Sequence, residues 1–459
     1  MQTEQESDSK KIWSGWNGNV RHPYQKLHII KSEEELRSHI LKAPGKVRVF
    51  GSRQSSADIA AGTDTLLDMT AYNQILHINE QNLQMTVQSG ITLKTLLCAM
   101  QARGWTLPCL PDIDTVTLGG ALATGTHGTG RDGKLLSSYM VSCRLVLADG
   151  SVRNVEEDEE LMDAVRVSLG LLGVMSEITL QCQPVSTLHL KEMPMPDTEW
   201  MKIFQKLLFQ NDFTRILWLP HTDHGYVILG NEIHPAKRTA ERKGPDYLKY
   251  RRRVSALLYR YTTRFPAFTK FANRIIHRLF FNSYKEYKGT LYDVTVTKSR
   301  SGTLELAEWT IALSRFPALM RELKAVLDDS NNPAWVHIPM DIRFVREDES
   351  WLSYAYGEDC VTIGCVCRDA ANADYYAAFE VTEEIFLKHG GRPHWGKRFV
   401  AKDAELSKLY PRWEDFKTLR AKLDPTGKFL NPYLTDLLNV NPQSVSSAPA
   451  FSRTEGCSV

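Results

Sequence analysis

The apolar and polar positions of the first 180 residues alternate between short β-rich runs and helical segments. Apolar runs bounded by turn residues predict strands over residues 46–50, 65–69, 84–88, 145–148 and 175–180. Helical spacing predicts a helix over 33–41, with Ser32 as its N-cap, and a second helix over 92–103, which ends before Gly104. This mixture indicates the α+β fold class.

Turn signals and charge extend this pattern along the chain. The pair Asp149-Gly150 predicts a hairpin turn, and the acidic run 156–160 is expected to open a helix, where negative charge suits the helix dipole. The pattern of residues 334–345 predicts a strand. From residue 441 onward the Pro-, Ser- and Ala-rich sequence has too little apolar content to order itself, so we expect disorder in 441–459.

A basic and aromatic segment occupies residues 249–288. Its spacing is amphipathic and helical, with a break at Pro266. Such a segment is typical of contact with an anionic membrane surface, but a helix pair packed on its own domain gives the same pattern. The sequence leaves both interpretations open.

The composition is that of a globular protein, with 459 residues, 42% hydrophobic and 24% charged, and excludes fibrous and disordered classes. A net charge of +2 provides no chain-wide field for nucleic acid, so no nucleic-acid partner is expected. The N-terminus lacks a secretory pattern and no apolar stretch is long enough to span a membrane, which predicts a cytoplasmic protein, with peripheral membrane contact left open. The 8 Cys have no zinc-site spacing, so we expect core residues and no metal.

Three glycine-rich segments carry candidate chemistry: residues 51–56, 118–130 and 170–174. The first directly follows a predicted strand, and a loop of small residues there can turn backbone N–H groups toward phosphate. The second holds five glycines among small hydroxyl residues. So many glycines cost conformational entropy on folding, which indicates that a large ligand approaches the backbone closely.

Two polar sets follow near the other end of the chain. Asp341 and Arg343 alternate on a predicted strand and therefore point to the same face. Such a pair can bind a polyol through charge-assisted hydrogen bonds, or it can be a surface ion pair. His394 and Lys397 flank Trp395 within six residues, an arrangement that combines a base, an aromatic ring and a cation.

These motifs, in this order and spacing, resemble those of the FAD-dependent aldonolactone oxidoreductases, a family of the vanillyl-alcohol-oxidase superfamily. The resemblance covers residues 13 to 437 and rests on residues 55–59 of the loop after the first strand, on 117–130, on 170–174, on 391–397 and on 423–433. It implies a two-domain flavoprotein with a PCMH-type FAD-binding domain at 13–182, a substrate-binding cap at 183–424, and a C-terminal segment at 425–440 that returns to the FAD domain.

The resemblance also implies roles for single residues. The FAD-binding residues would be Gly51, Ser52, Arg53, Gln54, Ser55 and Ser56, then Thr117, Gly119, Gly120, Gly125, Thr126, His127 and Gly128, then Gly173, Val174 and Lys397. Asp341 and Arg343 would lie at the substrate hydroxyls, and His394 would orient the substrate or carry a proton. Lys397 would place positive charge near the flavin atoms that become anionic on reduction.

Two positions depart from the family pattern. Many members carry a histidine in the first loop that is covalently bonded to the flavin, and Gln54 stands at that position. Because an amide cannot form this bond, we expect dissociable FAD, with His127 as the other candidate for attachment. Asp341 stands where the lactone enzymes usually carry glutamate, which withdraws the carboxylate by one methylene and could shift the preferred sugar.

The function implied is oxidation of an aldono-1,4-lactone by hydride transfer to the flavin, with O₂ or a quinone or cytochrome as electron acceptor. A flavin oxidase of an alditol, oligosaccharide or larger metabolite is an alternative. A different class of function, a peripheral membrane or partner-binding protein with a structural flavin, is suggested by the basic segment 249–288.

Overall fold

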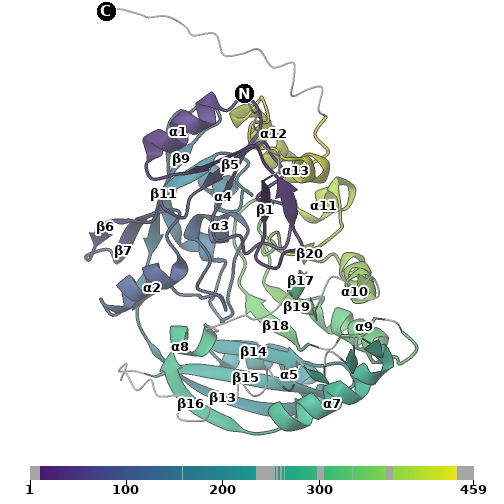
Figure 1. Cartoon of the computed structure of the whole chain (residues 1–459). Coiled ribbons are helices and arrows are strands. Elements are labelled where there is room, and N and C mark those ends of the chain that lie inside the picture. The colour runs from purple at the N-terminus through teal and green to yellow at the C-terminus, as the bar shows by residue number, and fades with distance from the viewer. Residues whose placement is uncertain are drawn as a thin grey trace, which may run out of the picture.

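The protein folds into an N-terminal part and a cap built on one large sheet, which lie at opposite ends of the molecule in Figure 1. The computed structural model describes residues 11–157, 159–233, 254, 257–258, 261–262, 264–296, 304–332, 334–336, 338–368 and 376–441. The tail predicted to be disordered, 441–459, lies outside the described residues except for residue 441. Of the basic segment 249–288, most of residues 249–263 also lie outside them.

The N-terminal part contains two main sheets. The parallel sheet has the order β3 (Lys26–Ile29), β5 (Thr65–Asp68), β4 (Val47–Phe50). The antiparallel sheet has the order β10 (Val152–Glu156), β9 (Met140–Val146), β11 (Val174–Gln181), β7 (Gln84–Gln88), β6 (Ile75–Asn79). The helices here are α1 (Glu33–Lys42), α2 (Leu93–Gln101), α3 (Leu118–Ala123), η1 (Leu136–Tyr139) and α4 (Glu160–Arg166). Short pairs join β1 (Ile12–Ser14) to β2 (Arg21–Pro23) and β8 (Trp105–Thr106) to β12 (Gln183–Pro184).

The cap is an eight-stranded antiparallel sheet. Its order is β16 (Lys285–Thr290), β13 (Thr187–Pro196), β15 (His224–Ile233), β14 (Phe213–Trp218), β18 (Met340–Val345), β19 (Cys360–Arg368), β17 (Leu304–Ala312), β20 (Arg392–Pro393). Its helices are α5 (Asp197–Gln210), η2 (Pro266–Phe268), α7 (Thr269–Phe280), α8 (Leu291–Thr295), α9 (Phe316–Asp328) and α10 (Tyr376–Lys388).

The chain then returns to the N-terminal part through α11 (Asp403–Leu409), α12 (Trp413–Leu423) and α13 (Pro432–Leu437), drawn in yellow beside the first strands in Figure 1. Arg412 pairs with Glu160 at 2.7 Å. The N–H of Val47 donates to the carbonyl of Lys428 at 2.8 Å. One buried apolar cluster continues from the N-terminal part into the cap, so the two parts share a core.

Local signals account for most of the predicted elements. Ser32 caps α1 by accepting the N–H of Glu35 at 3.2 Å, as predicted. The hairpin at Asp149-Gly150 joins β9 to β10, and Gly150 has the positive φ of 74° that such a turn favours. Both helix predictions and four of the five strand predictions for the N-terminal part are confirmed to within two residues. The fifth strand, predicted at 145–148, is β9, which begins five residues earlier and ends at Val146.

Two element predictions were wrong in extent. The helix after the acidic run begins only at Glu160, because residues up to Glu156 form the second strand of the hairpin. The strand predicted over 334–345 begins only at Met340, where pairing with β14 starts. Periodicity does not show where a pairing partner ends.

The burial of cysteine follows the prediction for the residues that the structure describes. Cys109, Cys143, Cys182, Cys360 and Cys365 are buried, and Cys98 is exposed. Within the described ranges, no helix combines the length and the apolar character needed to cross a membrane.

Candidate active site

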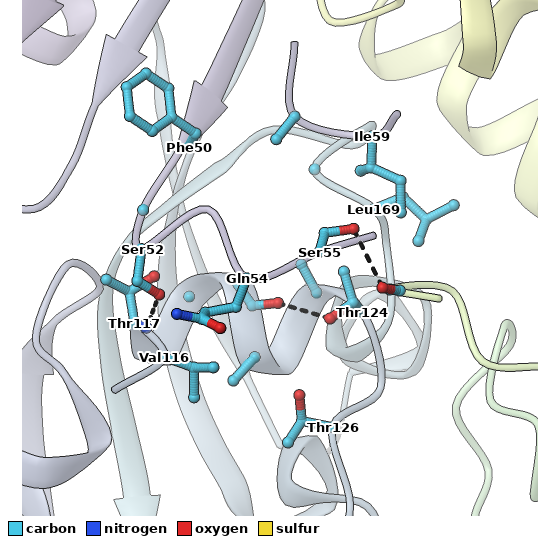
Figure 2. Close-up of a pocket in the computed structure, with 18 of the residues that line it drawn as sticks. Phe50, Ser52, Gln54, Ser55, Ile59, Val116, Thr117, Thr124, Thr126 and Leu169 are labelled. Carbon is cyan, nitrogen blue, oxygen red and sulfur yellow. Dashed lines mark hydrogen bonds between the residues drawn. The ribbon is translucent and has the colours of Figure 1, made fainter. Parts of the chain in front are cut away.

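A pocket lies between the N-terminal part and the cap, and residues from both line it. The N-terminal wall consists of the loop after β4, the start of α3 and the segment before β11. The cap wall carries four charged or titratable side chains: Glu308, Arg343, His394 and Lys397. Figure 2 shows the part of the wall formed by the first loop and α3.

The first glycine loop is fixed against α3. A Cβ atom on Gly51 would lie 1.9 Å from Oγ1 of Thr117, so only glycine fits at this contact. The N–H of Thr117 donates to the hydroxyl of Ser52 at 3.0 Å. Arg53 has a φ of 59° and its guanidinium lies 4.9 Å from the ring centroid of Phe50. Gln54 projects beside Thr117 and Val116 in Figure 2, and all three line the pocket.

The second glycine run forms α3 and the turn that follows it. Gly119, Gly120, Thr126 and His127 line the pocket. Gly128 lies behind them, where a Cβ would come within 2.3 Å of the carbonyl oxygen of Leu110. Glycine is therefore needed at some positions for contact within the protein as well as for space in the pocket.

Arg48, on β4, lines the N-terminal side of the pocket. Its buried guanidinium donates to the carbonyls of Leu169 and Phe429, both at 2.8 Å, and to that of Gly170 at 3.3 Å. Burial lowers the pKa of Arg48 to about 10, which still leaves it cationic at neutral pH. One side chain thus joins β4, the third glycine segment and the C-terminal return.

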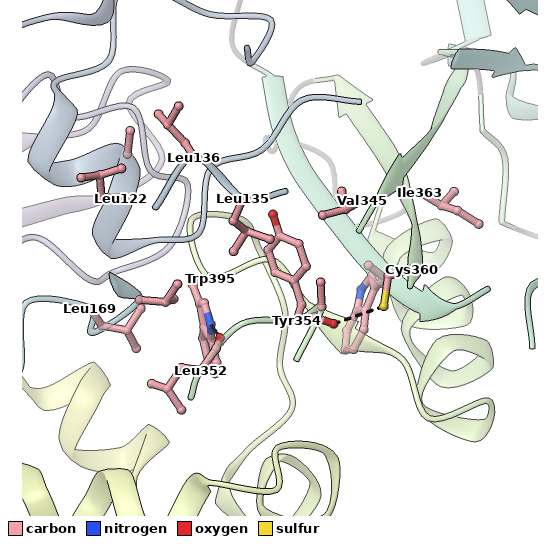
Figure 3. Close-up of a cluster of buried hydrophobic side chains, with 14 of the residues drawn as sticks. Leu122, Leu135, Leu136, Leu169, Val345, Leu352, Tyr354, Cys360, Ile363 and Trp395 are labelled. Atoms are coloured by element: carbon pink, nitrogen blue, oxygen red, sulfur yellow. Dashed lines mark hydrogen bonds between the residues drawn. The ribbon is translucent and has the colours of Figure 1, made fainter. Parts of the chain in front are cut away.

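One backbone hydrogen bond joins the cap wall to the first loop, and another holds two segments of the wall together. The N–H of His394 donates to the carbonyl of Glu308 at 2.9 Å. The carbonyl of Gly396 accepts the N–H of Ser56 at 2.9 Å. Trp395 anchors the same segment from below by donating its indole N–H to the carbonyl of Leu352 at 2.7 Å, within the apolar cluster of Figure 3. These contacts hold His394 and Lys397 at the pocket.

His127 and Glu308 form a direct pair across the interface. Nε2 of His127 lies 2.7 Å from Oε1 of Glu308, and Nδ1 lies 2.9 Å from the carbonyl oxygen of Gly128. Burial alone would raise the pKa of Glu308, but the charge and hydrogen bond of His127, with further positive charge from Lys397, hold it well below its usual range.

His394 lies beside this pair and is neutral. Burial, with the positive charge of Lys397, lowers the pKa of His394 to about 3. Its Nδ1 accepts the N–H of Gly396 at 3.1 Å. Ligand atoms of His127, Glu308 and His394 all lie within 4.8 Å of one another, but the 2.7 Å contact between the first two is a hydrogen bond that leaves no room for an ion between those atoms.

A second charged cluster adjoins the cap wall, and two of its members, Asp112 and Arg343, line the pocket. Asp341 accepts hydrogen bonds from Nε of Arg215 and from Nε of Arg343, both at 2.8 Å. Asp112 accepts from the same two arginines, at 2.9 Å from Arg215 and 2.6 Å from Arg343. Arg215 and Arg343 are directly opposite each other in the pairing of β14 with β18, so the two carboxylates separate like charges.

Comparisons with known proteins agree with this arrangement. A family model described as "D-arabinono-1,4-lactone oxidase" matches residues 178–437, and one described as "FAD binding domain" matches residues 26–156. The chain is 31% identical to L-gulonolactone oxidase of Mus musculus over 398 residues, which cover 85% of this chain and 89% of that protein. The chain belongs to the D-arabinono-1,4-lactone oxidase family.

Other relatives extend the match along the chain. L-gulono-1,4-lactone dehydrogenase of Mycobacterium tuberculosis is 31% identical over 438 residues, which cover 93% of this chain and 99% of that protein. Among solved structures, a cholesterol oxidase from B. sterolicum has a TM-score of 0.78 at 13% identity and covers 95% of this chain and 99% of that one. The likeness confirms the predicted α+β, vanillyl-alcohol-oxidase-type fold, and family membership makes the protein an FAD-dependent oxidoreductase of the aldonolactone class.

The residues of the pocket fit the cofactor of this lactone oxidase family. Where the first and third glycine segments meet, the lining offers backbone groups and the cations Arg48 and Arg53, which suit an anionic diphosphate. Within the described lining, the carboxylates are those of Asp112, which bonds Arg215 of the cap, and Glu308, which belongs to cap strand β17. These two carboxylates therefore lie on the cap side of the pocket, away from the cations that would hold the phosphates.

The pocket brings together most of the predicted site residues. Those that line it are Gly51, Ser52, Arg53, Gln54, Ser55, Thr117, Gly119, Gly120, Thr126, His127, Gly173, Val174, Arg343, His394 and Lys397. Ser56, Gly125, Gly128 and Asp341 are not among the lining residues. Asp341 instead lies against the two arginines, so it reaches the pocket only through Arg343.

Sequence analysis missed Glu308, Arg215, Asp112 and Arg48. None of them belongs to a glycine segment or to the two polar sets near residues 341 and 394. For Glu308 there was one available signal, since it is the single carboxylate of the run 306–312, which is apolar apart from Glu308 and Thr310 and forms part of β17. The other three depend on strand pairing and tertiary contacts, which leave no local pattern.

Proposed function

We propose that the protein oxidises an aldono-1,4-lactone of the gulono, galactono or arabinono type at the hydroxyl-bearing carbon next to the lactone carbonyl. The observation that carries this proposal is the convergence of Glu308, Arg343, His394 and Lys397 on a pocket whose other wall is the FAD-binding domain. Arg343 donates to substrate hydroxyls, and the neutral His394 donates through Nε2–H, because its Nδ1 already accepts a hydrogen bond. When bound, FAD supplies the hydride acceptor.

The division of the chain supports this assignment. We propose an FAD domain of residues 13–182, a substrate domain of 183–424 and a return segment of 425–440. The N–H of Val47 beside the first loop is held by Lys428 of the return segment, and Arg48 is held by Phe429. Through these two contacts the return segment supports the strand that leads into the first glycine loop.

The substrate proposal predicts bleaching of the flavin by lactones. When oxidised enzyme is mixed anaerobically with a panel of aldono-1,4-lactones and alditols, at least one lactone is expected to reduce the flavin faster than any alditol. Loss of the flavin absorption band measures the rate. Reduction by alditols alone would favour the alditol alternative, and reduction by neither would contradict the substrate class.

We propose further that FAD is bound without a covalent link. Gln54 lines the pocket at the loop position where many relatives carry the flavin-linked histidine, and its side chain is an amide, which cannot form that bond. Both ring nitrogens of His127 are already engaged, one with Gly128 and one with Glu308. Acid precipitation is therefore expected to leave the flavin in the supernatant, as measured by its absorption. Colour retained in the washed pellet would contradict this proposal.

The electrons that bound FAD would take from the substrate would go on to O₂ or to a quinone or cytochrome. Gln54 favours the quinone or cytochrome, because the covalent histidine link is common among the oxidases that the sequence resembles. Reoxidation of the reduced enzyme by air and by a soluble quinone, followed separately, distinguishes the two acceptors.

A second proposal concerns the surface around α7. The residues from 247 to 285 include ten Lys and Arg and no Asp or Glu. One face of α7 packs through Ile276 against Leu219 and Tyr226 of the cap. Other large apolar side chains of this region are exposed: Leu257, Tyr261, Phe265, Phe271 and Leu279. Exposed aromatic side chains beside a stretch of sequence rich in Lys and Arg support contact with an anionic lipid surface.

This surface predicts sedimentation with anionic vesicles. The protein is expected to pellet with vesicles that contain phosphatidylserine, less so as salt rises, and not with phosphatidylcholine alone. The double substitution Phe271→Ser and Leu279→Ser is expected to reduce the bound fraction several-fold. Leu76→Ser, at an exposed leucine of β6, is the matched control. Equal binding of all three proteins would contradict the proposal.

A further inference from the structure

We propose that Glu308 is the proton acceptor of the reaction, taking the proton of the substrate hydroxyl on Oε2, and that His127 is a positioning residue that keeps Glu308 anionic and correctly oriented. This inference rests on the proposed oxidation of a hydroxyl-bearing carbon. It assigns a role to Glu308, which the sequence did not single out, and moves His127 from cofactor binding alone to the chemistry.

The hydrogen bonds of His127 determine where its protons lie. The carbonyl oxygen of Gly128 can only accept, so Nδ1 at 2.9 Å must carry a proton. The 2.7 Å contact between Nε2 and Oε1 of Glu308 requires one further proton. The pair therefore shares one proton between Nε2 of His127 and Oε1 of Glu308, and the proposal places this proton on the imidazole so that Glu308 is a carboxylate. Oε2 of Glu308 remains for a substrate, since it makes no hydrogen bond within the described chain.

The other candidate bases of the pocket are already committed. Within the described lining, the only other carboxylate is that of Asp112, which is bound by Arg215 and Arg343. The imidazole of His394 uses Nδ1 to accept the Gly396 N–H, so its Nε2 carries a proton and donates. Among the carboxylates of the described lining, only that of Glu308 keeps an oxygen, Oε2, without a hydrogen bond in the described chain.

The charges that face Glu308 favour its anionic form. His127 faces it from the turn after α3, Lys397 from the segment after β20, and Arg343 from β18. His394 also faces it from the segment after β20, but it is neutral and adds no charge. Tyr354, whose hydroxyl donates to the carbonyl of Gly125, lies beside both histidines, at 5.5 Å from His127 between ring centroids. A carboxylate held among cations is a weak base, but the substrate hydroxyl becomes a much stronger acid as hydride leaves its carbon, so the proton can then pass to the carboxylate.

The step balances as follows. The substrate O–H bond breaks and its proton goes to Oε2 of Glu308, while the C–H bond of the same carbon breaks and its hydrogen leaves with both electrons to oxidised FAD. The electron pair of the O–H bond forms the new C=O bond. The substrate loses two electrons and FAD gains them, and Glu308 becomes a neutral acid beside the His127 imidazolium until it releases its proton to solvent.

The first experiment removes the acceptor. Glu308→Gln keeps the shape and one hydrogen-bonding oxygen, and it is expected to slow lactone-dependent flavin reduction about 100- to 10,000-fold. FAD content and the affinity for FAD, measured by titration of the apoenzyme, are expected to stay unchanged. Glu384→Gln, an exposed position on α10, is the control. Reduction by Glu308→Gln within threefold of wild type would overturn the proposal.

The second experiment tests the positioning role and needs no substrate. In ¹³C NMR of enzyme labelled at glutamate carboxyl carbons, the Glu308 signal, assigned by its loss in Glu308→Gln, is expected to be that of a carboxylate from pH 5 to 8. His127→Gln keeps a donor but removes the charge, and it is expected to move this titration, and the acidic limb of the rate profile, upward by about one pH unit or more. A protonated Glu308 at pH 7 in wild type, or an unmoved limb in His127→Gln, would refute the pair.

Two further outcomes are separable. If glutamine impairs folding, Glu308→Asp withdraws the carboxylate by one methylene and is expected to slow reduction at least tenfold; an unchanged rate would count against the proposal. If wild-type flavin is bleached by no lactone, the proposed substrate fails, whereas the NMR titration still decides whether His127 controls the charge of Glu308.

Discussion

Replacing Lys397 by methionine is expected to slow reduction of the flavin by lactone about 100- to 1,000-fold, with the protein folded and FAD still bound. Lys397 lines the pocket at the end where Glu308, Arg343 and His394 meet. Bound FAD would gain negative charge on accepting a hydride, and a cation fixed in the pocket lining, such as Lys397, would stabilise that charge without reorganisation. Methionine keeps the length and apolar stem of lysine and removes only the charge.

The measurement is rapid mixing under anaerobic conditions, with the flavin midpoint potential as a second readout. The variant is expected to have a lower potential, since its reduced, anionic flavin loses a stabilising charge. Lys408→Met, at an exposed position of α11 away from the pocket lining, is the control and is expected to behave as wild type. A variant at Lys397 with unchanged potential and rate would show that this cation does not act on the flavin.

The fold could be predicted where a short segment contains the residues that determine its own conformation. Ser32 caps its helix whatever lies around it, and Asp149-Gly150 closes a hairpin between neighbouring strands. The glycine loops were also recognisable, because a close contact such as that of Gly51 with Thr117 excludes every side chain. Such positions limit the residue type locally, so the sequence alone reveals them.

The cap wall shows why the rest could not be predicted. Glu308 meets His127 across 181 residues of chain, and Arg215 meets Asp341 across 126. Each of these side chains is costly to bury alone, and becomes stable only through a partner that the local sequence does not contain. The same reason explains the placement of Asp341. Its alternation with Arg343 correctly predicted that both side chains lie on one face of the strand, but the local sequence does not show that Arg215 binds Asp341 there.

Asp112, Arg215, Asp341 and Arg343 form one charged cluster at the cap wall. Asp341→Asn is expected to destabilise the protein by about 3–5 kcal/mol. Asp341 is 15% exposed and bonds two arginines, while Asp112 bonds the same two. The nearby carboxylates hold the pKa of Arg343 well above its usual value in spite of burial, so this arginine cannot lose its proton to relieve the imbalance. The substitution leaves two guanidinium groups and one carboxylate out of water.

Denaturant unfolding of the flavin-loaded enzyme measures this effect, and a second substitution identifies its cause. Arg215→Gln added to Asp341→Asn restores neutrality and leaves the pair of Arg343 with Asp112 intact. The double variant is therefore expected to be less destabilised than the sum of the single variants by more than about 1 kcal/mol. Asp132→Asn, at a carboxylate that is 79% exposed, is expected to change stability by less than about 0.5 kcal/mol.

The same pair of variants separates support of the wall from contact with the substrate. If Asp341 acts through Arg343, the double variant recovers stability but keeps a raised KM for lactone, because Arg343 loses one of the two carboxylates that fix its orientation. If Asp341 touched substrate hydroxyls itself, the single and double variants would share the same loss of affinity whatever their stability. Strictly additive free energies of unfolding would show that the four charges do not behave as one cluster.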